Sequence, residues 1–230
     1  MSDLGPLLGA LQLADSFFPS GRYTLSAGLE CFATASLLRD AGELEALLRD
    51  YVTFVLGASD AVAAAAGARA ATESDLPTVM AIDELLFALK LPAESAMSSV
   101  RTGRQLLTTA GRLSDDPVVA AYGRRVTDGE APGNHAVAFG VLAAAWSLSP
   151  LQAAAAELHA ALTGLLGAAL RLTRVDHNDA QGILRRLQPL LSDVAASAAA
   201  TEYHEMSAFA PTIEIMQMKH ETSHLRLFAS

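Results

Sequence analysis

The sequence has 230 residues, of which 51% are hydrophobic and 18% charged, and its formal net charge at pH 7 is -9. This length allows one substantial core or two small domains. The negative charge argues against nucleic acid as the main partner, because phosphate contacts need a basic surface. The single cysteine, Cys31, excludes an internal disulfide and any zinc site built from several cysteines, and it fits a reducing compartment.

The sequence gives no sign of export or of a membrane anchor. Residues 1–15 lack the basic segment that opens a secretory signal peptide. The apolar runs at 136–146 and 160–170 are shorter than the roughly 20 residues that a membrane-spanning helix needs. We therefore expect a cytoplasmic protein that has no membrane partner.

Helical periodicity, interrupted by turn and capping residues, runs along the whole chain. In chain order, the expected helices cover residues 4–14, 26–35, 41–56, 60–71, 74–88, 92–113, 117–126, 135–146, 150–172, 179–188 and 189–205. Gly57 is expected to end one of them, and Pro189 to start or kink another. No segment alternates as a strand would. The pattern predicts an all-α bundle of about nine or ten helices in a single domain, 1–230, with a C-terminal tail at about 212–230.

The tail contains the pattern His-Glu-x-x-His, at His220, Glu221 and His224. On a helix, two histidines four residues apart share a face and can bind zinc, with the glutamate as general base. Such a site needs a third ligand, usually well downstream, and only six residues follow His224. A C-terminal zinc metallohydrolase therefore stays as an alternative to a solvated or partner-facing helix.

Other catalytic patterns are missing from the sequence. The two lysines, Lys90 and Lys219, do not follow a Gly-rich turn, so we expect no nucleotide hydrolysis by this chain. Arg101 and Arg104 lie one helical turn apart and could hold a carboxylate or phosphate of a partner, or could belong to a merely exposed charged face. We assign no catalytic residue.

Residues 11–31 contain a rigid break between two expected helices. Pro19 cannot continue a helix, and Gly21 extends the break. The break also carries the aromatic residues Phe17, Phe18 and Tyr23. These rings dock on a partner or pack over the chain's own core.

The same stretch resembles the opening motif of the UreF-type urease accessory proteins. The matching positions are Leu11, Leu13, Ala14, Asp15, Ser16, Pro19, Gly21, Ser26, Gly28, Leu29 and Glu30. Arg22 is a departure, because a second glycine is expected at that position. Further segments resemble the same family in family order, through Pro92, Glu94, Ser98, Gly103 and Arg104; His135, Phe139 and Gly140; Arg171, Gln181, Leu184, Leu187 and Pro189; and Pro211, Ile215, Met218, His220, Glu221, Arg226, Leu227, Phe228 and Ser230.

The resemblance implies an all-helical, non-catalytic protein that holds no cofactor or metal of its own. It implies a homodimer that assembles with a UreD/UreH-type scaffold and a UreG-type GTPase, modulates that GTPase and assists nickel delivery to apo-urease. The partner-binding residues so implied are Pro19, Gly21, Tyr23, Ser26, Gly28, Glu30, Arg101, Gly103, Arg104, His220, Glu221, Arg226, Leu227 and Phe228. A generic helical scaffold unrelated to nickel remains an alternative.

The resemblance also assigns the tail to the scaffold. We expect Arg226 to supply charge-assisted hydrogen bonds to the scaffold and Phe228 to act as an apolar anchor. Deletion from Thr212 onward should then leave a folded, helical protein that no longer binds the scaffold.

Overall fold

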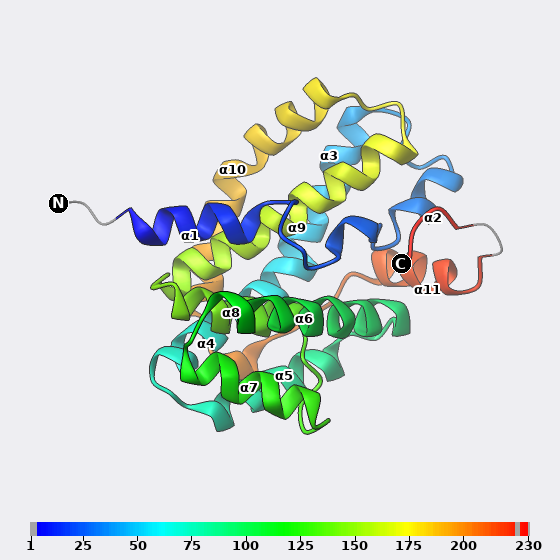
Figure 1. Ribbon diagram of the computed structural model, residues 1–230. Coiled ribbons are helices and arrows are strands. Elements are labelled where there is room, and N and C mark those ends of the chain that lie inside the picture. The colour runs from blue at the N-terminus through cyan, green and yellow to red at the C-terminus, as the bar shows by residue number, and fades with distance from the viewer. Residues whose placement is uncertain (1–3, 224–225, 230) are drawn as a thin grey trace.

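The computed structural model describes residues 4–223 and 226–229 (Figure 1). Within these residues every regular element is helical, which confirms the expected all-α bundle. The α-helices are α1 (Gly5–Ala14), α2 (Leu29–Thr34), α3 (Ala41–Asp50), α4 (Ala61–Thr72), α5 (Leu76–Leu89), α6 (Ala93–Leu113), α7 (Pro117–Thr127), α8 (His135–Ala145), α9 (Pro150–Leu172), α10 (His177–Ala200) and α11 (Pro211–Glu221).

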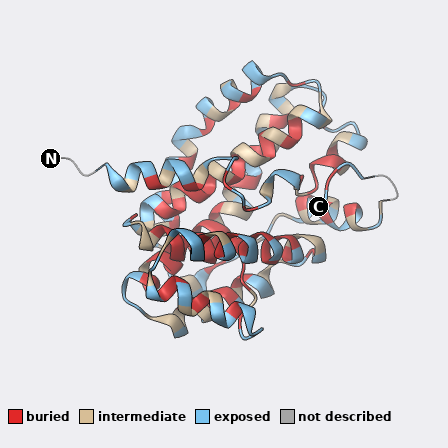
Figure 2. Cartoon of the chain, viewed as in Figure 1, coloured by how far each residue is buried: buried red, intermediate tan, exposed pale blue. Residues whose placement is uncertain are grey.

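The centre of the bundle is built from small residues. Helix α4 is mostly alanine, and it packs against α8 and α9. Figure 2 shows the resulting buried centre. Gly140 of α8 faces the Ala64 carbonyl of α4 so closely that an added Cβ would lie 2.2 Å from that oxygen. Small side chains therefore allow the backbones of the central helices to come into direct contact.

The structure corrects the expected helix end at Gly57. One continuous helix runs from Ala41 to Thr72, and its middle, Tyr51–Asp60, is a π-helical segment labelled η2. An added Cβ at Gly57 would lie 2.3 Å from Cγ1 of Val194 in α10. Packing against neighbouring helices thus outweighs the weak helix propensity of glycine, and the missing side chain makes room for α10.

Two other boundaries differ from the sequence-based expectation. Pro189 lies inside α10 and does not separate two helices. Helix α2 begins at Leu29 and not at Ser26, because Ala27 and Gly28 adopt positive φ angles of 49° and 89°. The tight turn at Ala27 and Gly28 delays the helix and sets the direction in which Glu30 points.

Within residues 4–223 and 226–229, two helices are long and apolar enough to span a membrane, whereas the sequence pattern indicated only the shorter runs 136–146 and 160–170. The two helices cover Ala41–Thr72 and Pro150–Leu172. Their most apolar windows are 72% and 61% buried inside the protein. Core helices of globular proteins pass the same test of length and composition, and this burial matches that role.

A buried carboxylate fixes the loop between α7 and α8. Asp83 of α5 accepts hydrogen bonds from the Gly133 and Asn134 backbone N–H groups at 2.7 and 2.8 Å, and from the Asn134 side-chain amide at 2.7 Å. The Tyr122 hydroxyl donates a fourth bond at 2.8 Å. Burial and the adjacent Asp83 carboxylate both raise the pKa of Tyr122. The loop is thereby held against α6, whose first turn contacts the tail.

Candidate partner-binding site

The first motif and the tail, far apart in the sequence, meet in one place. Helix α11 packs against α2 and the start of α6, and the C-terminal residues return beside α2 (Figure 1). Four side chains from these segments, Glu30, Glu94, His220 and Arg226, contact each other. We call these four residues the clasp. Sequence reasoning selected each segment but did not predict that they touch.

Glu30 holds the backbone of the last described residues. It is buried, and its carboxylate accepts hydrogen bonds from the N–H groups of Leu227 at 2.8 Å and Phe228 at 3.3 Å. The same carboxylate lies 3.1 Å from Nε2 of His220. Since hydrogen bonds to a charged acceptor are stronger than neutral ones, Glu30 fixes the tail in position.

Glu94 completes the clasp from the first turn of α6. Its carboxylate lies 2.7 Å from Nδ1 of His220 and also accepts a hydrogen bond from the Arg226 guanidinium. Its backbone N–H donates to the Glu221 carboxylate at 3.1 Å. Arg226 also donates to the Glu221 carbonyl. Arg226 thus makes its charge-assisted contacts within the chain.

The turn before α2 is shaped to receive α11. An added Cβ at Gly28 would lie 2.9 Å from Cγ of Gln217 and 3.1 Å from its backbone nitrogen, so only glycine fits. The Ala27 carbonyl accepts hydrogen bonds from the Tyr51 hydroxyl and from Nε2 of Gln217. Burial raises the pKa of Tyr51. The hydroxyl is therefore kept protonated as a donor.

The Arg171 guanidinium lies between two aromatic rings, one from the first motif and one from the tail, and links these two segments. The Arg171 guanidinium lies 4.4 Å from the Tyr23 ring centroid and 4.2 Å from that of Phe228. Arg171 also donates to the Tyr23 carbonyl at 2.9 Å. Cation–π contacts of this kind stabilise both rings. The N–H of Ala229 donates to the Thr24 carbonyl at 3.0 Å, which extends the attachment to the last described residue.

Phe228, the expected apolar anchor, is only 6% exposed in this structure and packs in the chain's own core, so its part in scaffold binding stays a prediction. Ser26, Glu30 and His220 are buried as well. Among the described residues of the tail, the exposed large apolar side chains are Ile215, Met218 and Leu227, which is 78% exposed. We call these three residues the tail face.

The remaining candidates divide between surface and interior. Pro19, Gly21 and Tyr23 are exposed. Of the other two aromatic residues, Phe17 is exposed, whereas Phe18 is buried with its ring edge-on to Trp146. Phe18 therefore packs over the chain's own core, and docking of the exposed Phe17 and Tyr23 on a partner stays a prediction.

On α6, Arg101 and Arg104 are exposed and line a shallow groove with Met97 and Ala229. Arg104 also donates to the Pro132 carbonyl at 3.3 Å. Gly103, on the same helix, is buried against the loop before α8 and does not line the groove. Gly103 therefore acts in packing, whereas the two arginines lie on the exposed side of the helix.

Of the His-Glu-x-x-His pattern, the structure describes His220 and Glu221. Helix α11 ends at Glu221, and both ring nitrogens of His220 contact carboxylates. His224 lies outside the described residues. Across residues 4–223 and 226–229, no cluster of three His, Cys, Asp or Glu side chains has the arrangement to hold a metal ion.

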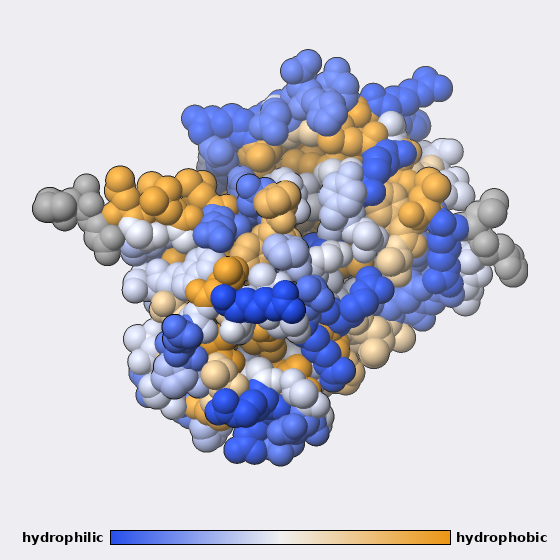
Figure 3. Space-filling model, viewed as in Figure 1, coloured by the Kyte–Doolittle hydropathy of each residue, from blue (hydrophilic) through white to orange (hydrophobic). Residues whose placement is uncertain are grey.

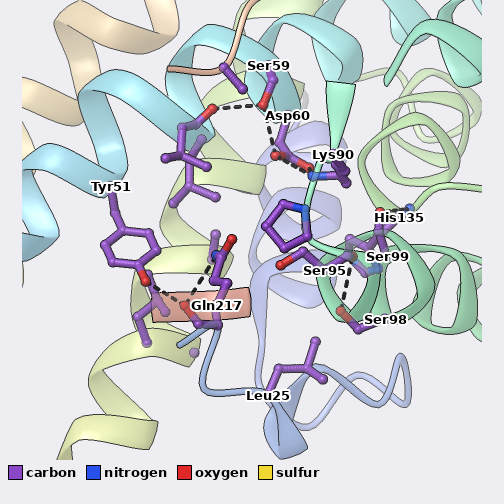
Figure 4. A pocket seen from close by; sticks show the side chains of 18 of the residues that line it. Leu25, Tyr51, Ser59, Asp60, Lys90, Ser95, Ser98, Ser99, His135 and Gln217 are labelled. Atoms are coloured by element: carbon purple, nitrogen blue, oxygen red, sulfur yellow. Dashed lines mark hydrogen bonds and ion pairs between the residues drawn. The ribbon is translucent and has the colours of Figure 1, made fainter. Parts of the chain in front are cut away.

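Sequence reasoning missed a cavity of about 150 Å³ that is lined by residues of α6, α9 and α11, among other elements, and is shown in Figure 4. Two ion pairs line it. Nζ of Lys90 donates to both Asp60 oxygens at 2.9 Å, and Arg22 donates to Glu157 at 2.9 Å. Asp60 and Glu157 lie in otherwise apolar helical runs of the sequence. A carboxylate buried in such a run needs a partner, and this need was the signal that could have revealed the cavity. Arg22, the departure from the family motif, is one of the partners.

His135 lies beside Glu157 in the same cavity wall. Its Nε2 is 3.7 Å from the Glu157 carboxylate, and its Nδ1 has no hydrogen-bond partner among the described residues. Burial and the Arg22 charge lower the pKa of His135 well below its ordinary value. Burial raises the pKa of Glu157 to about 7, against the opposing effect of Arg22. Both pKa shifts favour the neutral form of the side chain, so the wall contains two titratable groups that are less readily charged than usual.

We expect a specific pH dependence of stability from Glu157. Its folded-state pKa lies above its ordinary 4.5, so the folded state binds this proton more tightly than the unfolded state. The free energy of unfolding should therefore fall as pH rises from about 4.5 to about 7. Glu157→Gln removes this pH dependence. The stability of the variant relative to the unsubstituted protein should therefore increase by on the order of 2 kcal/mol as pH rises from 5 to 8.

Urea unfolding at several pH values measures this gain. His135 gives the opposite slope below pH 6.5, because its pKa is lowered. It also lies 3.7 Å from Glu157, so the effect of Glu157 itself is read from the difference between the two proteins above pH 6.5. The exposed Glu73→Gln is the matched control and should show a constant difference. A Glu157→Gln difference that does not change with pH contradicts the prediction.

Comparison with known proteins places the whole chain in one family. A UreF family model matches residues 38–188, more than half of the chain. The "Urease accessory protein UreF" of Trichodesmium erythraeum (strain IMS101) is 31% identical over 229 residues, covering 100% of this chain and 99% of that protein. "Urease accessory protein UreF 2" of Brucella canis (strain ATCC 23365 / NCTC 10854 / RM-666) is 31% identical over 225 residues, covering 96% and 91%.

A third relative, the "Urease accessory protein UreF" of Bacillus sp. (strain TB-90), is 28% identical over 224 residues, covering 97% of this chain and 99% of that protein. The clasp residues Glu30, His220 and Arg226 lie outside the family-model match, but the match to the Trichodesmium protein covers the entire chain. The resemblance found in the motifs is confirmed, and the chain belongs to the UreF family of urease accessory proteins.

Proposed function

We propose that this chain assists nickel insertion into apo-urease by assembling with a UreD/UreH-type scaffold and modulating a UreG-type GTPase. The relatives carry the name of urease accessory proteins, which supports a role in urease maturation. The observation that carries the proposal is the tail face. Three apolar side chains are held outward on a segment that the clasp fixes to the body.

The tail face is the surface that we assign to the scaffold. Ile215 and Met218 lie one turn apart on α11, and Leu227 follows on the attached end. Exposed apolar groups on a fixed backbone bind a partner at low entropic cost, and methionine adapts to an uneven surface. The clasp residues then act indirectly, by positioning this face.

Two further surfaces fit the other proposed partners. The exposed Arg101 and Arg104 suit an acidic surface of the GTPase, because guanidinium groups bind carboxylates with charge-assisted hydrogen bonds. Figure 3 shows an apolar α1, whose Leu7, Leu8 and Leu11 are exposed, as is Leu4 just before the helix. This stripe supports the proposed homodimer, since a second copy would bury it. The compartment that we propose is the cytoplasm, with neither nucleic acid nor membrane as a partner.

We propose no catalytic activity for the chain. In a zinc hydrolase the metal needs a free ring nitrogen on each histidine ligand. Both nitrogens of His220 contact carboxylates, which disfavours the metallohydrolase alternative. Peptidase activity that disappears on His224→Ala would revive it.

The tail face is tested by the double substitution Ile215→Asp, Met218→Asp. We expect scaffold binding to weaken at least about tenfold, because two buried contacts of an interface centre commonly contribute more than 1.4 kcal/mol. Urease activation in cells should fall with it. Titration of the purified scaffold, with far-UV circular dichroism of the variant, measures both binding and folding.

The exposed Leu151→Asp on α9 is the control and should bind the scaffold normally. The deletion from Thr212 onward is a weaker test, because it also removes the buried Ile213, His220 and Phe228. A folded double variant that binds the scaffold like the unsubstituted protein contradicts the proposed docking surface.

A further inference from the structure

The His220 ring lies between two carboxylates. The residue is 1% exposed, its Nδ1 is 2.7 Å from Glu94, and its Nε2 is 3.1 Å from Glu30. A neutral imidazole has a proton on one nitrogen only, so it can donate to one of these carboxylates. Its other nitrogen would then direct a lone pair at a carboxylate oxygen. The geometry suits an imidazolium ion, which donates to both.

The surrounding charges make that proton important for the tail. Among the described residues, the charged groups that contact His220 or its partners are Glu30 from α2, Glu94 from α6, Glu221 from α11 and Arg226 from the tail. With His220 charged, two cations face three carboxylates. With His220 neutral, one cation remains, and the repulsion between the carboxylates on either side of the buried ring increases.

We propose that His220 is a proton-operated latch for residues 226–229. The charged ring keeps Glu30 in the position where it accepts hydrogen bonds from Leu227 and Phe228. Loss of the proton weakens the clasp and releases the segment. Among the ordinary side chains, histidine is the one best suited to gain or lose a proton in a regulatory contact.

Release would change the surface of the protein. Phe228 would leave its buried position beside Arg171, and the Glu30 carboxylate would become accessible. The tail face would lose Leu227 as a fixed member. The latch is independent of which partner binds there, and it goes beyond the proposed function.

Hydrogen exchange of the backbone amides tests the latch. Protection factors, which remove the intrinsic pH dependence of exchange, are measured by NMR for Leu227, Phe228 and Ala229 between pH 6 and 9. We expect all three to fall at least tenfold, in step with the titration of the His220 ring protons. Amides of the buried helix α4 should keep constant protection factors over the same range.

Three variants identify the cause. Glu94→Gln lets a neutral imidazole donate to Glu30 and accept from the new amide, so its protection factors should stay constant with pH. His220→Gln should give low protection at every pH. The exposed His204→Gln is the control and should behave like the unsubstituted protein. Protection factors that stay constant in the unsubstituted protein, or that fall equally in Glu94→Gln, overturn the proposal.

Discussion

Replacement of Asp83 by alanine is expected to lower the free energy of unfolding by about 4 kcal/mol or more. The carboxylate is fully buried and accepts bonds from two backbone N–H groups, a side-chain amide and a tyrosine hydroxyl. Removing it leaves these donors buried without an acceptor, at a cost of roughly 1–3 kcal/mol for each group that water cannot reach. Because folded domains are stable by only about 5–15 kcal/mol, the loss is a large part of the total.

Urea unfolding followed by circular dichroism measures this loss. Glu84 is the next residue on α5 and is exposed, so Glu84→Ala is the matched control and should change stability by less than about 0.5 kcal/mol. Asp83→Asn keeps the shape but directs an amide N–H₂ toward other donors, and it should remain severely destabilised. An Asp83→Ala loss below about 1 kcal/mol would show that water replaces the carboxylate.

The second large effect is expected from Gly103→Ala. A Cβ at this position would lie 2.1 Å from the Gly133 carbonyl oxygen and 2.6 Å from the Asn134 carbonyl carbon. The loop cannot retreat easily, because Asp83 holds both of these residues by their N–H groups. We expect a loss of about 3 kcal/mol, at the upper end of the range for overpacked cores.

Gly111 on the same helix gives a matched comparison, since nothing lies within 4 Å of its added Cβ. Gly111→Ala should increase stability by up to about 1 kcal/mol, because alanine is the better helix former. The same substitution is thus expected to have opposite signs at two positions of α6. Equal effects at the two sites, measured by thermal and urea unfolding, would contradict the packing argument.

The helices that the sequence predicted best are those with clear local signals. Residues 92–113 and 150–172 were expected as helices, and α6 and α9 occupy Ala93–Leu113 and Pro150–Leu172. For α9 the signal is Ser149 as the cap with Pro150 in the first turn, and the structure contains both and adds a capping box through Gln152.

The errors occurred where distant residues decide. Gly57 and Pro189 are local helix breakers, but neighbouring helices hold both segments helical. The resemblance supplied Glu30, Glu94, His220 and Arg226 as members of motifs. Their mutual contacts depend on how α2, α6 and α11 pack, and helical spacing says nothing about residues more than a hundred positions apart.

The clasp also has a consequence for the order of folding. His220 contacts Glu30 across 190 positions of sequence, and closing so long a loop costs chain entropy before any contact forms. Helices α4, α8 and α9 meet through larger apolar surfaces and can assemble without the tail. We expect the clasp to close after the folding transition state, so that its hydrogen bonds slow unfolding and leave the folding rate almost unchanged.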